Sequence, residues 1–216
     1  MVPSLSMSAV PAADALAISS WALQQKIASP ALQHVRVDGL RGIVASVDIP
    51  AGEPLVQLPA SAMLVQPDGS GPWWVRLASL LTQDHPEKAQ YMQYLEESEC
   101  TVPLQWPAPC VDALCYPYMQ QQIKGQRRLF RIHHTLSGPP GCSLQRFSWA
   151  LTQVLSRAYQ LPPTQGTSTS SVDDGIMALL PVVDSINHHS SILTDMYWNE
   201  VKGSLLLLYT KHSALL

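Results

Sequence analysis

The polar run between Asp184 and Ser190 contains residue types that could hold a small ligand. Asn187 offers an amide donor and an amide acceptor, and His188 offers ring nitrogens together with its backbone groups. Taken alone, a run of asparagine, histidine and serine is more often a polar turn. The residues therefore indicate either a ligand site or a turn until their surroundings are considered.

Arg157 is a second residue that could bind a ligand, because a guanidinium is a planar fork that matches a carboxylate. It lies at the edge of the apolar stripe of a predicted helix, and that stripe contains Leu144, Phe147, Leu151, Val154 and Ala158. A cation near the C-terminal end of a helix is also favourable through the helix dipole alone. Both interpretations of Arg157 are open.

Other kinds of active site find little support. The sequence has no G-x-S-x-G nucleophile elbow, no P-loop and no glycine fingerprint of a dinucleotide-binding fold. His133 and His134 lie near three arginines, but a solvated helix face explains that cluster better than a hydrolytic site. The cysteines form no C-x-x-C pair, so we expect buried free thiols rather than a zinc ribbon: Cys100, Cys110, Cys115 and Cys142.

The composition is that of a folded domain. Of the 216 residues, 46% are hydrophobic and 13% are charged, and the formal net charge is −3. No basic tract indicates a nucleic-acid partner, and no apolar run reaches the roughly 20 residues that span a bilayer. The N-terminus lacks the basic region of a secretory signal, so we do not expect secretion.

The N-terminal part of the sequence predicts mainly strands. We expect a helix at 16–27 and strands at 35–37, 43–47 and 55–58. Proline and glycine in Ile49–Gly52 occupy positions that suit a type I turn, so Gly42–Leu58 is predicted to be a β-hairpin.

The middle of the sequence predicts helices. Apolar spacing favours helices over 72–83, after Asp84, over 111–133 and over 143–161, with an extended, proline-rich connection at 103–109. Asp84 can cap the helix that follows it, and this helix should turn Tyr91, Met92 and Leu95 inward. Residues 162–175 are rich in serine, threonine and glycine and are predicted to be a flexible loop.

The C-terminal part predicts strands again. The apolar stretch Ile176–Val183 is compatible with a buried strand or a short helix. Tyr197–Tyr209, with a turn at Lys202-Gly203, predicts a final hairpin. Strands, then helices, then strands indicate an α+β fold in which a helical insertion splits a small β domain.

Four stretches, taken in order, resemble the plant-type SET family, which includes Rubisco large-subunit lysine methyltransferases and actin-histidine methyltransferases. The stretches are Arg41–Pro59, Pro103–Pro107, Phe147–Tyr159 and Ala178–Ser190. The resemblance implies small SET-type sheets interrupted by a helical insert. It divides the chain into a flexible tail at 1–14, the N-terminal SET half at 15–65, the insert at 66–175 and an incomplete C-terminal half at 176–216.

The resemblance also implies a cofactor, S-adenosylmethionine, and a protein substrate with a target lysine or histidine. Asn187 and His188 would line the cofactor site after Asp184, and Arg157 would hold the cofactor's carboxylate. The backbone of Gln57 and Leu58 would meet the cofactor, although relatives often carry an acid at the position of Gln57. His189 is extra relative to the usual Asn-His-Ser motif, which puts the role of Ser190 in doubt.

No catalytic residue can be assigned from the resemblance. The family's tyrosine lies in a C-terminal Tyr-Gly motif, and nothing after Lys211-His212-Ser213 resembles it before Leu216. The notable tyrosines near the end, Tyr197 and Tyr209, precede that point and are interpreted as hairpin residues. We therefore expect either a truncated gene product or an inactive relative of lysine methyltransferases.

A non-catalytic protein- or cofactor-binding module derived from a SET protein is the alternative. Residues 1–14 contain Asp14 and no basic residue, so they support an organellar transit peptide only weakly. Relatives work in chloroplast, cytosol and nucleus, and the sequence selects neither the compartment nor the target protein.

Overall fold

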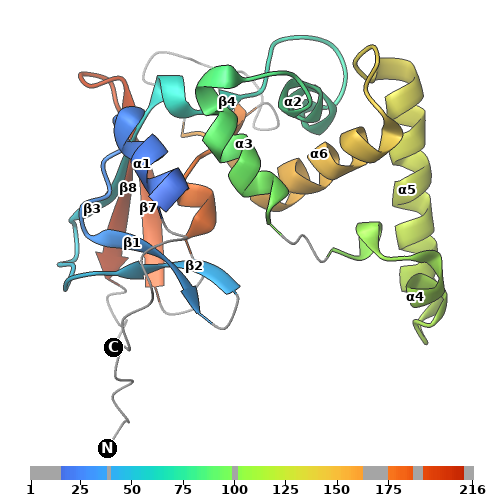
Figure 1. Cartoon of the computed structure of the whole chain (residues 1–216), viewed down its shortest axis with the longest axis horizontal. Helices are drawn as coiled ribbons and strands as arrows, with labels where there is room; N and C mark the ends of the chain where they lie inside the picture. The colour runs from blue at the N-terminus through green and yellow to red at the C-terminus, as the bar shows by residue number, and fades with distance from the viewer. Residues whose placement is uncertain (1–15, 38–39, 99–101, 163–174, 187–191, 212–216) are drawn as a thin grey trace, which may run out of the picture. The chain divides into compact units, whose positions relative to one another are not determined.

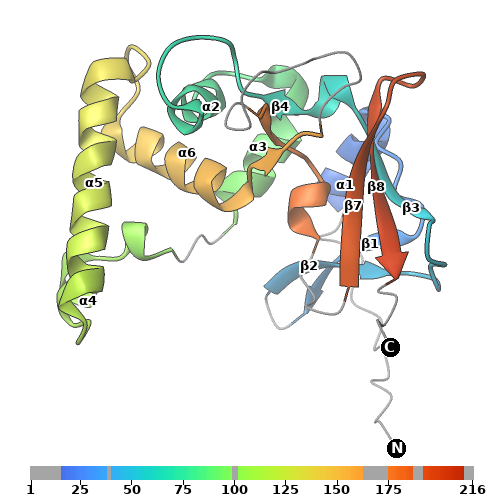
Figure 2. The same ribbon diagram turned by 180° about the vertical axis from the view of Figure 1, so that it is seen from behind.

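The computed structural model describes residues 16–37, 40–98, 102–162, 175–186 and 192–211. The chain forms two compact units (Figures 1 and 2). Unit 1 comprises Met1–Ala62 and Pro181–Leu216, and unit 2 comprises Met63–Leu180. Helices and small antiparallel sheets make an α+β fold, as the sequence predicts.

The described residues of unit 1 form two antiparallel sheets. Strands β1 (Leu32–Val37) and β2 (Leu40–Ala45) pair with each other. Strands β3 (Pro54–Pro59), β8 (Ser204–Lys211) and β7 (Ile192–Asn199) form a second sheet with β8 in its centre (Figure 1). The central position of β8 brings two segments that are far apart in the sequence, Pro54–Pro59 and Ile192–Lys211, into one sheet.

The predicted hairpin over Gly42–Leu58 is wrong. Strand β2 pairs with β1 and not with β3, whereas β3 pairs with β8. The physical reason is apolar content, because β3 buries Leu55, Val56 and Leu58 and finds an equally apolar partner in Leu205–Leu208. The predicted turn is also shifted: the backbone N–H of Glu53 donates to the carbonyl of Pro50 at 3.2 Å.

The final hairpin and the first helix are confirmed. Strands β7 and β8 pair from Asn199↔Ser204 outward, and the turn between them contains Lys202 and Gly203. Helix α1 (Leu16–Gln24) ends earlier than predicted, and it buries Trp21, which is 2% exposed. This tryptophan supplies one of the largest side chains in the core of unit 1.

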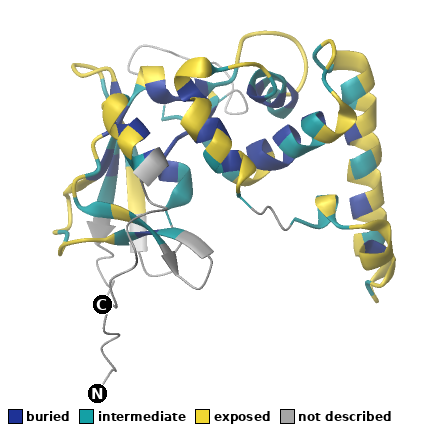
Figure 3. Ribbon diagram, viewed as in Figure 1, coloured by how far each residue is buried: buried dark blue, intermediate teal, exposed yellow. Residues whose placement is uncertain are grey.

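Unit 2 consists mainly of helices: α2 (Trp73–Leu81), α3 (Ala89–Glu96), α4 (Ala108–Asp112), α5 (Pro117–Ser137) and α6 (Leu144–Arg157). A small sheet has the order β4 (Leu64–Val65), β6 (Met177–Leu179) and β5 (Tyr159–Gln160). Figure 3 shows buried and exposed faces along α6, whereas α5 is exposed over most of its surface.

The apolar stripe predicted for α6 is confirmed at its centre, since Phe147, Leu151 and Val154 are all 0% exposed. At its ends the prediction is wrong, because Leu144 is 36% exposed and the helix ends at Arg157, before Ala158. Ser143 starts this helix as its N-cap, and its hydroxyl accepts a hydrogen bond from the backbone N–H of Arg146 at 3.1 Å. The stripe and the cap together fix the position and the rotation of α6 within unit 2. The inward side chains predicted for α3, namely Tyr91, Met92 and Leu95, are also buried.

The proline-rich region differs from its prediction. Residues 103–109 are not fully extended, because Pro103–Gln105 forms a short 3₁₀ helix, η3, and α4 begins at Ala108. The helix predicted over 111–133 is divided into α4 and α5 at Pro117, which cannot continue a helix but fits its first position. The same preference for the first turn explains Pro103 and Pro109.

Two smaller predictions, for Asp84 and for the cysteines, are wrong, and a third falls on residues that the structure does not describe. Asp84 does not cap the next helix: His85 precedes the 3₁₀ turn Pro86–Lys88 without a side-chain cap. Cys110 and Cys115 are exposed rather than buried. The loop predicted at 162–175 falls almost entirely outside the described residues. Within the part of the chain that the structure describes, no helix is long and apolar enough to cross a membrane.

Candidate functional site

Arg157 is the last residue of α6, and its side chain is fixed by a residue one turn earlier. Its Nε donates a hydrogen bond to Oε1 of Gln153 at 3.0 Å. Residues four apart on a helix lie on the same face, which places the two side chains next to each other. Arg157 is half-buried, whereas Gln153 is 0% exposed. The guanidinium is therefore held from the interior side of the helix.

The amide of Gln153 has one satisfied end and one unsatisfied end. Because the Nε of Arg157 can only donate, the atom that faces it must be the amide oxygen, and this fixes the orientation of the amide. Among the described residues, Nε2 of Gln153 is buried without an acceptor. An unsatisfied buried donor costs about 1–3 kcal/mol, so its presence calls for an explanation.

Gln57 and Leu58 lie in β3 of unit 1. The backbone N–H of Gln57 donates to the carbonyl of Ala28 at 2.8 Å, and the N–H of Ala28 donates back at 3.0 Å. The side-chain Nε2 of Gln57 donates to the hydroxyl of Ser204 on β8 at 3.1 Å. Leu58 is 0% exposed and belongs to the core. Gln57 thus ties β3 to its neighbours through backbone and side chain alike.

Asp184 lies in the 3₁₀ turn Val183–Ser185, termed η4, also in unit 1. It is half-buried, and its carboxylate accepts a hydrogen bond from the hydroxyl of Ser185 at 3.1 Å. Val182, just before this turn, has φ 73° and ψ −49°, close to the rare and strained γ-turn conformation. Backbone strain of this kind is found disproportionately at functional sites.

The candidate residues are divided between the two units. Gln57, Leu58 and Asp184 belong to unit 1, and Arg157 belongs to unit 2. Asn187 and His188 lie outside the described residues, so their predicted ligand contacts stay predictions.

Two features of the candidate site were not predicted from the sequence. The signal for Gln153 was its position four residues before Arg157 on a predicted helix, whereas nothing in the sequence marks the strain at Val182.

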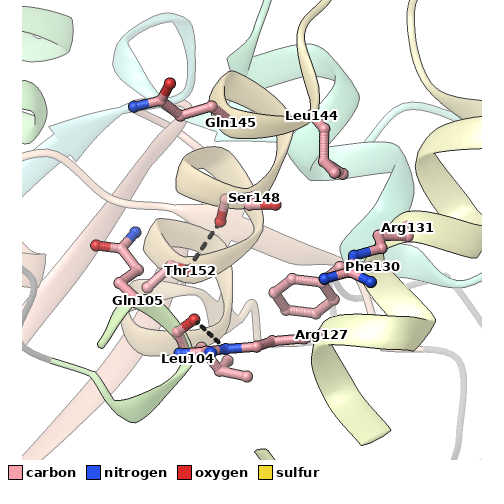
Figure 4. A pocket seen from close by; sticks show the side chains of 9 residues that line it. All are labelled: Leu104, Gln105, Arg127, Phe130, Arg131, Leu144, Gln145, Ser148 and Thr152. Carbon is pink, nitrogen blue, oxygen red and sulfur yellow. Dashed lines mark hydrogen bonds between the residues drawn. The ribbon is translucent and has the colours of Figure 1, made fainter. Parts of the chain in front are cut away.

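A pocket of about 450 Å³ opens within unit 2, between η3, α5 and α6 (Figure 4). Leu104, Phe130 and Leu144 give it an apolar lining, and Arg127 and Arg131 of α5 give it positive charge. Arg127 is hydrogen-bonded to η3, because its Nε donates to the carbonyl of Leu104 at 3.0 Å. None of the described residues that line the pocket is acidic, so its chemistry favours an anionic or acidic ligand.

In the described ranges, no group of three or more histidine, cysteine, aspartate or glutamate side chains is placed to hold a metal ion. The described polar groups instead suit an organic anion. Arg157 has its Nε held by Gln153, so the edge formed by its two terminal amino groups is the one that could donate a pair of bonds to a carboxylate. The residues at the end of α6 therefore fit a carboxylate ligand.

Comparison with solved structures defines the fold. The SET domain of LSMT bound to lysine and AdoHcy matches with a TM-score of 0.71 at 15% identity, covering 90% of this chain and 50% of that chain. The same domain bound to methyllysine and AdoHcy gives 0.66 at 14% identity, covering 92% and 53%. Rubisco LSMT bound to AdoMet gives 0.66 at 16% identity, covering 90% and 49%.

These likenesses show that the chain has the fold of the LSMT SET domain, as the sequence motifs predict. No protein-family model matches the sequence, and no curated protein sequence matches it either. The chain spans about half the length of the structures that it resembles. At such low identity the likeness defines the fold alone.

Proposed function

We propose that this chain is an S-adenosylmethionine-dependent protein lysine N-methyltransferase by lineage. The observation that carries the proposal is the likeness, at a TM-score of 0.71, to a SET domain whose solved structure holds lysine and AdoHcy. A second likeness, at 0.66, is to Rubisco LSMT holding AdoMet. S-adenosylmethionine, when bound, supplies the methyl group. The substrate class is a protein with a target lysine or, by the resemblance to actin-histidine methyltransferases, a target histidine.

We assign the ligand contacts residue by residue. Arg157 binds the carboxylate of the cofactor, which its half-buried, oriented guanidinium suits. Asn187 and His188 bind the adenosyl part through their amide and ring nitrogens. Asp184 supports this segment from η4, while Gln57 and Leu58 contribute through β3. No residue is assigned to catalysis.

The test is calorimetric titration of S-adenosylmethionine into the purified chain. We expect saturable binding by the unaltered chain and loss of that binding in Asn187→Ala. Because the chain spans about half the length of the matched structures, binding is a better first measurement than turnover. A matched control is Asn199→Ala in β7, which removes an asparagine at the turn of the final hairpin and should leave binding unchanged.

No binding to a chain shown by circular dichroism to be folded would refute the proposal. Equal loss in Asn187→Ala and Asn199→Ala would also count against the assigned site, because it would reflect a general effect on folding. Binding followed by methyl transfer to a lysine-containing protein in an extract would extend the proposal to activity.

A non-catalytic binding module is the second candidate, and the pocket of unit 2 favours it. Its apolar lining and the exposed Arg131 suit an acidic protein segment with an apolar anchor. A peptide of alternating glutamate and leucine, followed by fluorescence anisotropy, should bind the unaltered chain and Lys202→Glu, but not Arg131→Glu. Lys202 is exposed in unit 1, so it provides the same charge change away from the pocket. Equal binding by all three chains would eliminate this candidate.

A further inference from the structure

The amide of Gln153 binds the interior side of the Arg157 guanidinium and has no evident structural role of its own. Gln153 is 0% exposed, and its oxygen accepts the hydrogen bond from Nε of Arg157 at 3.0 Å. Its Nε2 is buried with no acceptor among the described residues. Three nearby positions of α6 are apolar, with Ala150, Leu151 and Val154 all 0% exposed, whereas the buried hydroxyl of Thr152 donates to the carbonyl of Ser148 at 2.8 Å. A nonpolar side chain of the same length would therefore suit this position better for stability alone.

We propose that Gln153 is a positioning residue, which fixes the guanidinium of Arg157 for the carboxylate of S-adenosylmethionine. This inference rests on the proposed function, since it names a determinant of the same ligand contact. An arginine side chain has many rotamers, and ordering them when a ligand binds costs free energy. The hydrogen bond from Nε to Gln153 restricts those rotamers before the ligand arrives. The orphaned amide nitrogen is then a cost of that preorganisation.

The hydrogen bond also selects which edge of the guanidinium can meet the ligand. With Nε committed to Gln153, a carboxylate can take two parallel bonds only from the terminal amino groups. Without Gln153, the Nε edge would compete for the same carboxylate in a different orientation. Gln153 therefore affects the orientation of the bound amino-acid part as well as the affinity.

A positioning role for Gln153 predicts weaker ligand binding without lower thermal stability, so a single variant can test it. Gln153→Met keeps the length of the side chain and removes both the acceptor and the unsatisfied donor. A purely structural glutamine would lower the melting temperature when it is replaced. A positioning glutamine should leave the melting temperature equal or higher, because the buried donor without a partner disappears.

The experiment compares two ligands by calorimetry with the full chain. S-adenosylmethionine carries the carboxylate, whereas methylthioadenosine has the same adenosyl part and lacks the amino-acid part. We expect Gln153→Met to weaken the binding of S-adenosylmethionine by about three- to tenfold, the typical worth of one hydrogen bond. The binding of methylthioadenosine should stay within about twofold of the unaltered chain. Gln122→Met, an exposed glutamine on α5, is the matched control and should change neither ligand.

The outcomes distinguish this inference from the proposed function. If the unaltered chain binds neither ligand, the proposed function fails and the role of Gln153 fails with it. If it binds both, and Gln153→Met binds both as well as the unaltered chain does, only the positioning role is overturned. Equal weakening of both ligands, with a lower melting temperature, would likewise overturn it in favour of a structural role.

Discussion

Val182 shows how a single residue can store strain in this fold. Its side chain is 1% exposed, and its backbone has φ 73°, a value that β-branched residues rarely adopt. Its neighbour Val183 is 2% exposed and begins the turn η4, which contains Asp184. Two adjacent, equally buried valines therefore differ mainly in their backbone conformation. The difference offers a direct measure of the strain held next to a candidate site residue.

We predict that Val182→Gly destabilises the chain less than Val183→Gly does, by about 1–3 kcal/mol. Both changes delete the same buried side chain and add the same flexibility to the unfolded chain. Only the change at position 182 releases the strained backbone, because glycine adopts positive φ without penalty. Urea unfolding of the two variants measures the difference. Equal losses of stability would show that the conformation at Val182 is not strained.

At the scale of single elements, Arg127 connects the short helix η3 to α5. Its guanidinium donates to the carbonyls of Leu104 at 3.0 Å and Pro103 at 3.1 Å, and also to the carbonyl of Trp106. These carbonyls belong to a proline-rich segment that has few backbone donors of its own. One side chain thus binds three carbonyls of this segment, in addition to the backbone N–H of Trp106, which donates to the carbonyl of Pro103 at 3.3 Å.

We predict that Arg127→Met lowers the free energy of unfolding by about 2 kcal/mol, the order expected for hydrogen bonds to a charged group. Arg128→Met is the control, because Arg128 is the next residue of α5 and is exposed. It should change stability by no more than about 0.5 kcal/mol. Chemical unfolding followed by tryptophan fluorescence compares the two. A similar small effect in both variants would mean that η3 is held by its apolar contacts instead.

Helix α1 and strand β1 meet at a histidine whose charge state depends on folding. The hydroxyl of Ser19 lies 3.2 Å from Nδ1 of His34. Burial lowers the pKa of His34 from its ordinary value of 6.5, since desolvation disfavours the charged ring. The unfolded chain then binds more protons than the folded chain, so stability is fully present above the unfolded pKa and is lost as the pH falls from there through the folded pKa.

We predict that acidification from neutral pH to below 6.5 destabilises the chain through His34. In His34→Gln the part of this loss that comes from the histidine should disappear, because glutamine does not titrate. Melting temperatures measured across this pH range for both chains give the comparison. Parallel curves for the two chains would contradict the prediction.

Features encoded by neighbouring residues could be predicted from the sequence, whereas a pairing between distant strands could not. The buried centre of the α6 stripe and the final hairpin were predicted correctly, because each is encoded by residues close together in the sequence. The pairing of β3 with β8 was not predictable from local turn residues, since its partner lies at Ser204–Lys211. For the candidate site, the ligand contact predicted for Arg157 stays a prediction, whereas the hydrogen bond between its Nε and the buried Gln153 needed coordinates.

At the scale of the whole molecule, unit 2 begins and ends at one sheet. Leu64 of β4 pairs with Leu179 of β6, so the two ends of Met63–Leu180 run side by side. Closely spaced ends are a feature of inserted domains that fold independently. The unit also has its own apolar centre, in which Leu77, Leu81 and Leu151 are 0% exposed. The sheet at the ends of unit 2 is formed by its own strands, in the order β4, β6 and β5.

We predict that residues 63–180, expressed alone, fold into a helical unit with a cooperative thermal transition, because their ends are paired and their core is continuous. Far-ultraviolet circular dichroism measures both properties. In this segment Leu151→Asp should abolish the transition, since it would bury an unpaired carboxylate. Leu155→Asp, one turn further along α6 and 46% exposed, should keep it. A helical signal that melts without a transition, or an equal response to the two aspartates, would mean that unit 2 needs the rest of the chain to specify its core.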